Sequence, residues 1–177
     1  MLVGSLSSYV YGLAAYLPND IEELLDTFSD QICMAFEAQK QLVFIGNGGS
    51  YACAEHWATD LALLGFSTKT IPPAIITAFA NDFGYEASYS QSHAFDKNML
   101  IAFSVSGKSR NILPLGSEFY YSVLLTGKDY DRDAPYHLII PIQSNDFGLV
   151  EDIHLIISHY IKRRIEKWIK QKNPSSR

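Results

Sequence analysis

The 177-residue sequence has two cysteines, few charges (19%) and no apolar run near the ~20 residues that a membrane span needs. Cys33 and Cys53 lie among apolar neighbours, without the spacing of a disulfide framework or a CxxC metal site, and are expected to be buried thiols. Residues 1–17 lack the basic start and clean apolar core of a signal peptide. These absences predict a cytoplasmic protein without a membrane partner.

Positive charge is also scarce. The 14 lysines and arginines face 19 acidic residues, which gives a net charge of −5. This balance argues against a nucleic-acid partner, because nucleic acids bind to clustered positive surfaces. One dense basic cluster falls in the last expected helix and is predicted to be a solvated face; it comprises Lys162, Arg163, Arg164, Lys167, Lys170 and Lys172.

The rest of the composition, 47% hydrophobic, is that of one globular domain. Short apolar runs that alternate with helical patterns predict an α/β fold, in which helices cover both faces of a parallel sheet. Asp20 and Gly65 are expected to cap helices. The expected strands are 41–46, 67–71, 99–105, 119–126 and 137–142, and the expected helices are 21–36, 50–64, 74–81, 85–95, 109–116 and 149–169.

Two loops follow expected strands at the carboxyl edge of the sheet, where such folds bind ligands. In the first, GNGGS at 46–50, the glycines allow close backbone approach and the following helix start attracts anions; a simple tight turn is the alternative. It fits a dinucleotide loop poorly, because the third small residue is missing. The second, SVSGKS at 104–109, predicts a phosphate cradle before another helix start, with routine helix capping as the alternative.

Two helical stretches carry imidazoles and carboxylates. His56 and Asp60 are four residues apart and share a helix face, while Glu151 and His159, eight apart, nearly share another. Two imidazoles and two carboxylates suit zinc or a similar divalent ion, although a surface ion pair is the alternative for His56 and Asp60. His154 lies about 60° from the direction of Glu151 and is expected to be a core or supporting histidine.

These motifs, in this order, resemble the SIS (sugar isomerase) family and, within it, the phosphoheptose isomerase branch. The resemblance spans about residues 20–170 and rests on FIGNGGS at 44–50, HWATDL at 56–61, ANDFGYE at 80–86, FSVSGKS at 103–109, LLTGKD at 124–129 and EDIHLIISH at 151–159. It implies one flavodoxin-like SIS domain over 1–177, with helices over 1–40, a five-stranded parallel sheet core over 41–145, a last helix over 149–170 and a tail over 173–177, which is expected to be disordered.

The resemblance implies a homotetramer with active sites at subunit interfaces. The implied activity is a step of heptose biosynthesis, the ketose–aldose isomerisation of sedoheptulose 7-phosphate to D-glycero-D-manno-heptose 7-phosphate through an enediol. Asp60 and His159 would act as base and acid, and zinc would be bound by His56, Asp60, Glu151 and His159. The phosphorylated sugar would be bound by Asn47, Gly48, Gly49, Ser50, Asp82, Ser104, Ser106 and Ser109.

Three residues depart from the usual pattern of that family: Asp60 stands in place of glutamate, Glu151 in place of glutamine and Lys108 in place of asparagine. Aspartate reaches about one methylene less than glutamate, and small misplacements of a catalytic group are costly. The alternative function is therefore a non-catalytic SIS module that acts as a phosphosugar sensor or a protein-binding adaptor. The retained histidines and carboxylates favour the enzyme.

Overall fold

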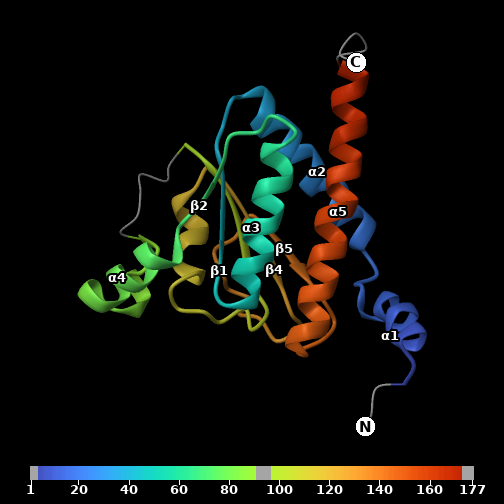
Figure 1. Ribbon diagram of the computed structural model, residues 1–177, viewed down its shortest axis with the longest axis horizontal. Coiled ribbons are helices and arrows are strands. Elements are labelled where there is room, and N and C mark those ends of the chain that lie inside the picture. Colours follow the sequence, from blue (N-terminus) through green and yellow to red (C-terminus); the bar gives the residue numbers. More distant parts are fainter. Residues whose placement is uncertain (1–3, 91–96, 173–177) are drawn as a thin grey trace.

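The computed structural model describes residues 4–90 and 97–172 (Figure 1). Its centre is a five-stranded parallel sheet, as the sequence predicts, and the strand order is β2-β1-β3-β4-β5. The strands of the middle, β1 and β3, are continuous apolar runs that are buried on both faces. The strands are β1 (Leu42–Gly46), β2 (Thr68–Thr70), β3 (Met99–Ser104), β4 (Tyr121–Thr126) and β5 (Leu138–Pro141).

The register of the sheet positions the two predicted loops. β1 pairs with β3 so that Gly46 lies opposite Phe103. The loops over 46–50 and 104–109 therefore leave neighbouring strands at the same carboxyl edge, which is where ligands bind in open α/β sheets.

Three long helices cover one face of the sheet: α2 (Ile21–Glu37), α3 (Gly49–Ala62) and α5 (Phe147–Lys172). Trp57 of α3 is fully buried there and packs edge-on against Phe28 and Phe44. In Figure 1, α3 and α5 lie next to each other on this side. Gly65, which follows α3, has φ +92° and confirms the predicted stop, whereas the Asp20 side chain makes no capping hydrogen bond to α2.

Shorter elements cover the other face. The 3₁₀ helix η4 (Leu113–Glu118) packs there with Tyr89 and Phe119, and α4 (Pro73–Phe83) contributes only the partly buried Ile76. At the opposite end of the chain, α1 (Leu6–Gly12) buries none of its residues and is followed by the 3₁₀ helix η1 (Leu13–Tyr16).

Two predicted helices are wrong. Residues 109–112 form turns that lead into η4, because Pro114 has no N–H for an α-helical bond and interrupts the expected helix over 109–116. The described part of the expected helix over 85–95 holds the 3₁₀ helix η2 (Tyr85–Ala87), after which Tyr89 turns into the core and donates its hydroxyl to the carbonyl of Gly46. Residues 91–95 and the predicted tail over 173–177 lie outside the described residues. None of the described helices is both long and apolar enough to cross a membrane.

Candidate active site

Helices α3 and α5 lie side by side and run in the same direction, so the levels of one helix match those of the other (Figure 1). Because α3 begins just after β1, its first turn lies at the carboxyl edge of the sheet. From that edge outward the matching pairs are Ser50 with Glu151, His56 with His159, and Asp60 with Lys162.

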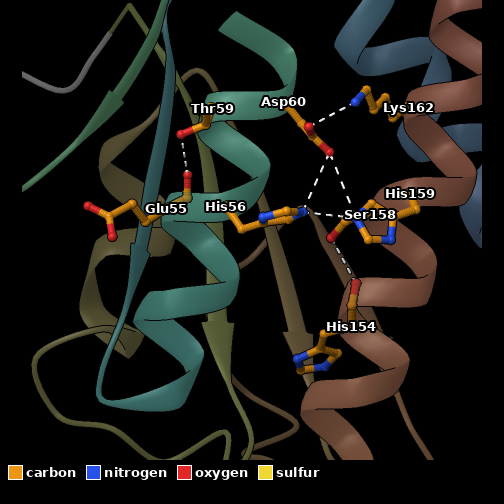
Figure 2. A network of polar contacts seen from close by, with 8 residues as sticks. All are labelled: Glu55, His56, Thr59, Asp60, His154, Ser158, His159 and Lys162. Carbon is orange, nitrogen blue, oxygen red and sulfur yellow. Dashed lines mark hydrogen bonds and ion pairs between the residues drawn. The ribbon is translucent and has the colours of Figure 1, made fainter. Parts of the chain in front are cut away.

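Three of the four residues predicted to bind zinc meet between these helices. The Nε2 atoms of His56 and His159 lie 2.9 Å apart, and Oδ2 of Asp60 lies 3.7 Å from the first and 3.9 Å from the second (Figure 2). Both histidine side chains are 51% exposed, whereas that of Asp60 is 13% exposed. The Asp60 Oδ2 atom is buried and has no hydrogen-bond partner among the described residues. Three potential ligand atoms thus surround one point.

The spacing of these three atoms fits a metal ion. A tetrahedral zinc ion with bonds of about 2.0–2.2 Å holds its ligand atoms roughly 3.3 Å apart. The observed separations of 2.9, 3.7 and 3.9 Å lie on both sides of that value. A buried carboxylate oxygen without a partner costs free energy, and a cation at this point would remove that cost. Two imidazoles and one carboxylate also form a known donor set for zinc.

Glu151, the fourth predicted ligand, lies apart from this cluster at the first turn of α3. Its Oε1 accepts a hydrogen bond from Ser50 Oγ at 3.1 Å. A side chain at Gly49 would collide with this carboxylate, so the glycine allows the close approach. Glu151 therefore occupies the end of the helix at which free backbone N–H groups attract an anion.

A cavity of about 450 Å³ joins the first turn of α3 to the histidine cluster. Gly49 and Glu151 line one part of it, His56 and His159 line another, and Cys53 lies between them. Burial and the nearby Glu151 carboxylate raise the pKa of Cys53 to about 11, so its thiol stays protonated. A ligand in this cavity would reach from the anion-binding turn to the two imidazoles.

The second predicted loop gathers its serines after β3. Ser104 is buried, and its Oγ lies 3.0 Å from Oγ of Ser109. Ser106 is exposed and accepts a hydrogen bond from the backbone N–H of Lys108 at 3.2 Å. Gly107 has φ +57°, a left-handed conformation that glycine adopts without strain. Since turns follow this loop, its hydroxyls and backbone amides, and not the start of an α-helix, are the groups that could bind a phosphate.

A partly buried amide pair connects the first loop to the segment that follows the second. Asn47 Nδ2 donates to Asn111 Oδ1 at 3.0 Å, and Asn111 Nδ2 donates back to Asn47 Oδ1 at 3.1 Å. Asn111, which is fully buried, also donates to Ser88 Oγ, and Asn47 donates to the Tyr85 hydroxyl. Our sequence analysis did not select Asn111, Ser88 or Tyr85. The only signal was a polar amide just after the serine-rich loop, within a segment that we interpreted as an ordinary helix.

Asp82 lies on α4, exposed, and its Oδ1 accepts a hydrogen bond from the adjacent Asn81 side chain at 2.9 Å. None of the α4 residues is buried, and large apolar side chains such as Ile75 and Phe83 are exposed on it. The predicted role of Asp82 in the sugar site therefore stays a proposal.

The prediction that the basic cluster of the last helix is a solvated face is wrong for Lys162 and Arg164, which are partly buried, whereas Lys172 is exposed as predicted. Lys162 binds Asp60, with Nζ 2.8 Å from Oδ1. Arg164 pairs with Asp26 at 2.5 Å, and Lys172 pairs with Glu37. The charge pattern alone does not reveal these pairs, because the carboxylates come from distant parts of the chain.

His154 is a core residue, as its angular position on the helix predicts. It is fully buried and packs against the ring of Phe103. Burial lowers the pKa of the imidazole to about 3, so it is neutral at physiological pH.

The two cysteines, Cys33 and Cys53, are both free, and burial raises the pKa of Cys33 to about 11. Neither cysteine has the depressed pKa of a reactive thiol.

The flavodoxin-like sheet, the two loops at its carboxyl edge and the cavity beside them define an SIS domain of the phosphosugar isomerase class. Solved structures share this fold. The phosphoheptose isomerase GmhA from Neisseria gonorrhoeae superposes with a TM-score of 0.78 at 17% identity, covering 91% of this chain and 94% of that chain. A phosphoheptose isomerase from Francisella tularensis superposes with a TM-score of 0.75 at 19% identity, covering 91% of this chain and 92% of that chain.

Sequence similarity identifies the branch. A phosphoheptose isomerase from Leptospira biflexa (strain Patoc 1 / Ames) is 35% identical over 146 residues, covering 71% of this chain and 74% of that protein. One from Helicobacter pylori (strain HPAG1) is 31% identical over 159 residues, covering 77% and 80%. No protein-family model matches the chain. The chain belongs to the phosphoheptose isomerase family.

Proposed function

We propose that this protein converts sedoheptulose 7-phosphate into D-glycero-D-manno-heptose 7-phosphate. The main support is the cavity that links an anion-binding turn at Gly49 with the His56, Asp60 and His159 cluster. Such an arrangement suits a phosphorylated sugar, whose charged end would be anchored while its carbonyl end meets acid–base groups. The names of the related proteins supply the particular sugar.

In this proposal Asp60 is the base. Isomerisation through an enediol requires one group to move a proton between C1 and C2 of the sugar. The Oδ2 atom of Asp60 is buried and has no hydrogen-bond partner among the described residues, so it is available to accept that proton. Its other oxygen, Oδ1, is bound to Lys162 and would not take part, so Oδ2 would act either as this base or as a zinc ligand at any one moment.

His159 is the proposed acid, which would protonate the oxygen that becomes a hydroxyl. Its Nε2 faces His56 and Asp60. An imidazole nitrogen that binds a metal ion cannot at the same time carry a proton. The roles of His159 as zinc ligand and as acid therefore exclude each other at any one moment, and the effect of zinc on turnover distinguishes them.

His56, His159 and Asp60 would hold zinc, and Glu151 would have to leave Ser50 to join them. When bound, the ion would polarise the sugar carbonyl and stabilise the negative charge that develops on its oxygen. The loop hydroxyls of Ser50, Ser104, Ser106 and Ser109, with the backbone at Gly48 and Gly49, would bind the phosphate. Asn47 and Asp82 would line the sugar site.

We further propose a homotetramer in the cytoplasm, where a charged sugar phosphate would be retained. Exposed apolar side chains on α1 and α4 support an assembly, because a monomer would leave them in water: Leu6, Val10, Tyr11, Ile75 and Phe83. Sedimentation at micromolar concentration measures the oligomeric state, and a monomer there would rule the assembly out.

One coupled assay tests the proposed activity: turnover of sedoheptulose 7-phosphate by the purified protein as isolated, after treatment with chelator, and after zinc is added back. We expect turnover of the sugar phosphate. Loss of turnover with chelator and its recovery with zinc would assign His159 the role of a zinc ligand. Turnover that survives chelation would assign His159 to the acid role without zinc. Binding of the sugar phosphate by calorimetry without any turnover would refute the isomerase and favour the sensor.

A further inference from the structure

Lys162 reaches from α5 to the candidate metal cluster. Its Nζ lies 2.8 Å from Oδ1 of Asp60, on the neighbouring helix α3, and the two side chains are only 25% and 13% exposed (Figure 2). Lys162 follows His159 by three residues and therefore projects from nearly the same face of α5. A positive charge is thus part of this site before any metal ion binds.

The two oxygens of the Asp60 carboxylate consequently have different environments. Oδ1 is bound to the ammonium of Lys162. Oδ2 is buried, has no hydrogen-bond partner among the described residues, and lies at ion-pair distance from the Nε2 atoms of His56 and His159. The ammonium thereby determines which oxygen is presented to the imidazoles. A metal ion at the cluster could use Oδ2 alone, unless Lys162 withdraws.

We propose that Lys162 is a resident cation that orients Asp60 and competes with the divalent ion for its carboxylate. The inference rests on the proposed zinc site, and it concerns how tightly that site holds its ion. Lys162 lowers the affinity in two ways: it withholds Oδ1 from coordination, and it adds a like charge next to the ion.

Loss of Lys162 would have two opposing effects on zinc binding. Without its partner the Asp60 carboxylate would be less well oriented, which weakens binding. Removal of a positive charge from a partly buried position beside a doubly charged ion strengthens it, because Coulomb interactions grow with the product of the charges and are poorly screened there. Asp60 is also held by its own helix and by burial, so we expect the charge effect to dominate.

Three variants separate charge from packing. Lys162→Met removes the ammonium and keeps much of the apolar stem, whereas Lys162→Arg keeps a positive charge that can bind Oδ1. Lys167→Met makes the same charge change at an exposed position of the same helix and is the matched control. Circular dichroism and urea unfolding of each metal-free protein establish that it is folded.

The test is the zinc dissociation constant of each metal-free protein, measured by competition with a chromophoric chelator. We expect Lys162→Met to lower it at least tenfold, and Lys162→Arg and Lys167→Met to stay within about threefold of the unchanged protein. An unchanged or raised constant in Lys162→Met, an equal decrease in Lys167→Met, or the absence of zinc binding in all four proteins would overturn the proposal. Isomerase activity is measured separately, so a protein with this order of affinities but no turnover would refute the proposed function alone.

Discussion

The hydroxyl of Ser50 donates a hydrogen bond to Oε1 of Glu151 over 3.1 Å, which holds the carboxylate against the first turn of α3. That turn is also where the phosphate of a sugar would be attracted by the free backbone N–H groups of the helix. The bound substrate would therefore meet a negative charge at the position that should favour an anion.

Glu151→Gln should strengthen the binding of a sugar phosphate, since it removes this charge and keeps a group that can accept the Ser50 hydrogen bond. We expect a gain of about 1 kcal/mol, the size of a charge effect at a helix terminus. Calorimetry with sedoheptulose 7-phosphate measures it. Glu55→Gln, which removes an exposed negative charge from α3, is the control. Weaker binding by Glu151→Gln would show that the carboxylate assists the substrate.

Ser106→Ala should weaken sugar-phosphate binding by about 1–2 kcal/mol, because a hydroxyl that donates to a charged phosphate oxygen is lost. Ser106 is exposed, so the fold should be unaffected. Ser117→Ala, at an exposed serine on η4, is the matched control for the same titration. Equal affinity in the two variants would remove Ser106 from the phosphate site.

Asp60→Asn should leave the fold and sugar-phosphate binding intact and lower kcat by roughly 10²–10⁴, the usual contribution of a general base. The amide is nearly the same size as the carboxylate but cannot accept the proton. Steady-state kinetics give kcat and KM separately, and Glu55→Gln controls for loss of a negative charge on α3. If Asp60→Asn keeps near-full turnover, the base lies elsewhere.

His154 should make stability depend on pH below neutrality. Its folded pKa, about 3, lies below the unfolded value of 6.5, so between these values the unfolded chain binds one more proton than the folded chain. The contribution of His154 to the free energy of unfolding is therefore complete above the unfolded pKa. It falls by about 1.4 kcal/mol per pH unit as the pH drops between the two pKa values.

His154→Leu tests this contribution, because leucine fills a similar apolar site and does not titrate. The free energy of unfolding of both proteins is measured with urea at several pH values between the two pKa values. Plotted against pH, it should have a shallower slope for the variant, and the difference should correspond to about one proton. Equal slopes would mean that the buried imidazole is protonated in the folded state.

Sequence patterns predicted the sheet because strands buried on both faces must be continuous apolar runs, as at 42–46 and 99–104. They also predicted which helix faces carry His56 and His159, since that depends only on helical periodicity. They could not predict that these rings would meet at 2.9 Å, because the match between α3 and α5 depends on packing through Trp57 and other core residues.

The errors have different physical origins. The expected helix over 109–116 contains Pro114, a local signal that already argues against an α-helix there. The expected helix over 85–95 was inferred from local composition, whereas a tertiary hydrogen bond of Tyr89 helps to decide the backbone there. Lys162 was assigned to solvent because no short-range signal links it to Asp60, which lies 102 positions earlier. Residue pairs of this kind require a three-dimensional structure.

Because the candidate metal ligands come from α3 and from the much later α5, they are synthesised at different times. His56 and Asp60 leave the ribosome long before His159, which follows His56 by 103 positions. Until α5 docks, the nascent chain displays an unpaired carboxylate and one imidazole on α3, too few ligands for a stable zinc site. Zinc would therefore bind at the proposed site only after α5 has docked. A chain whose synthesis stops before α5 would not hold zinc there.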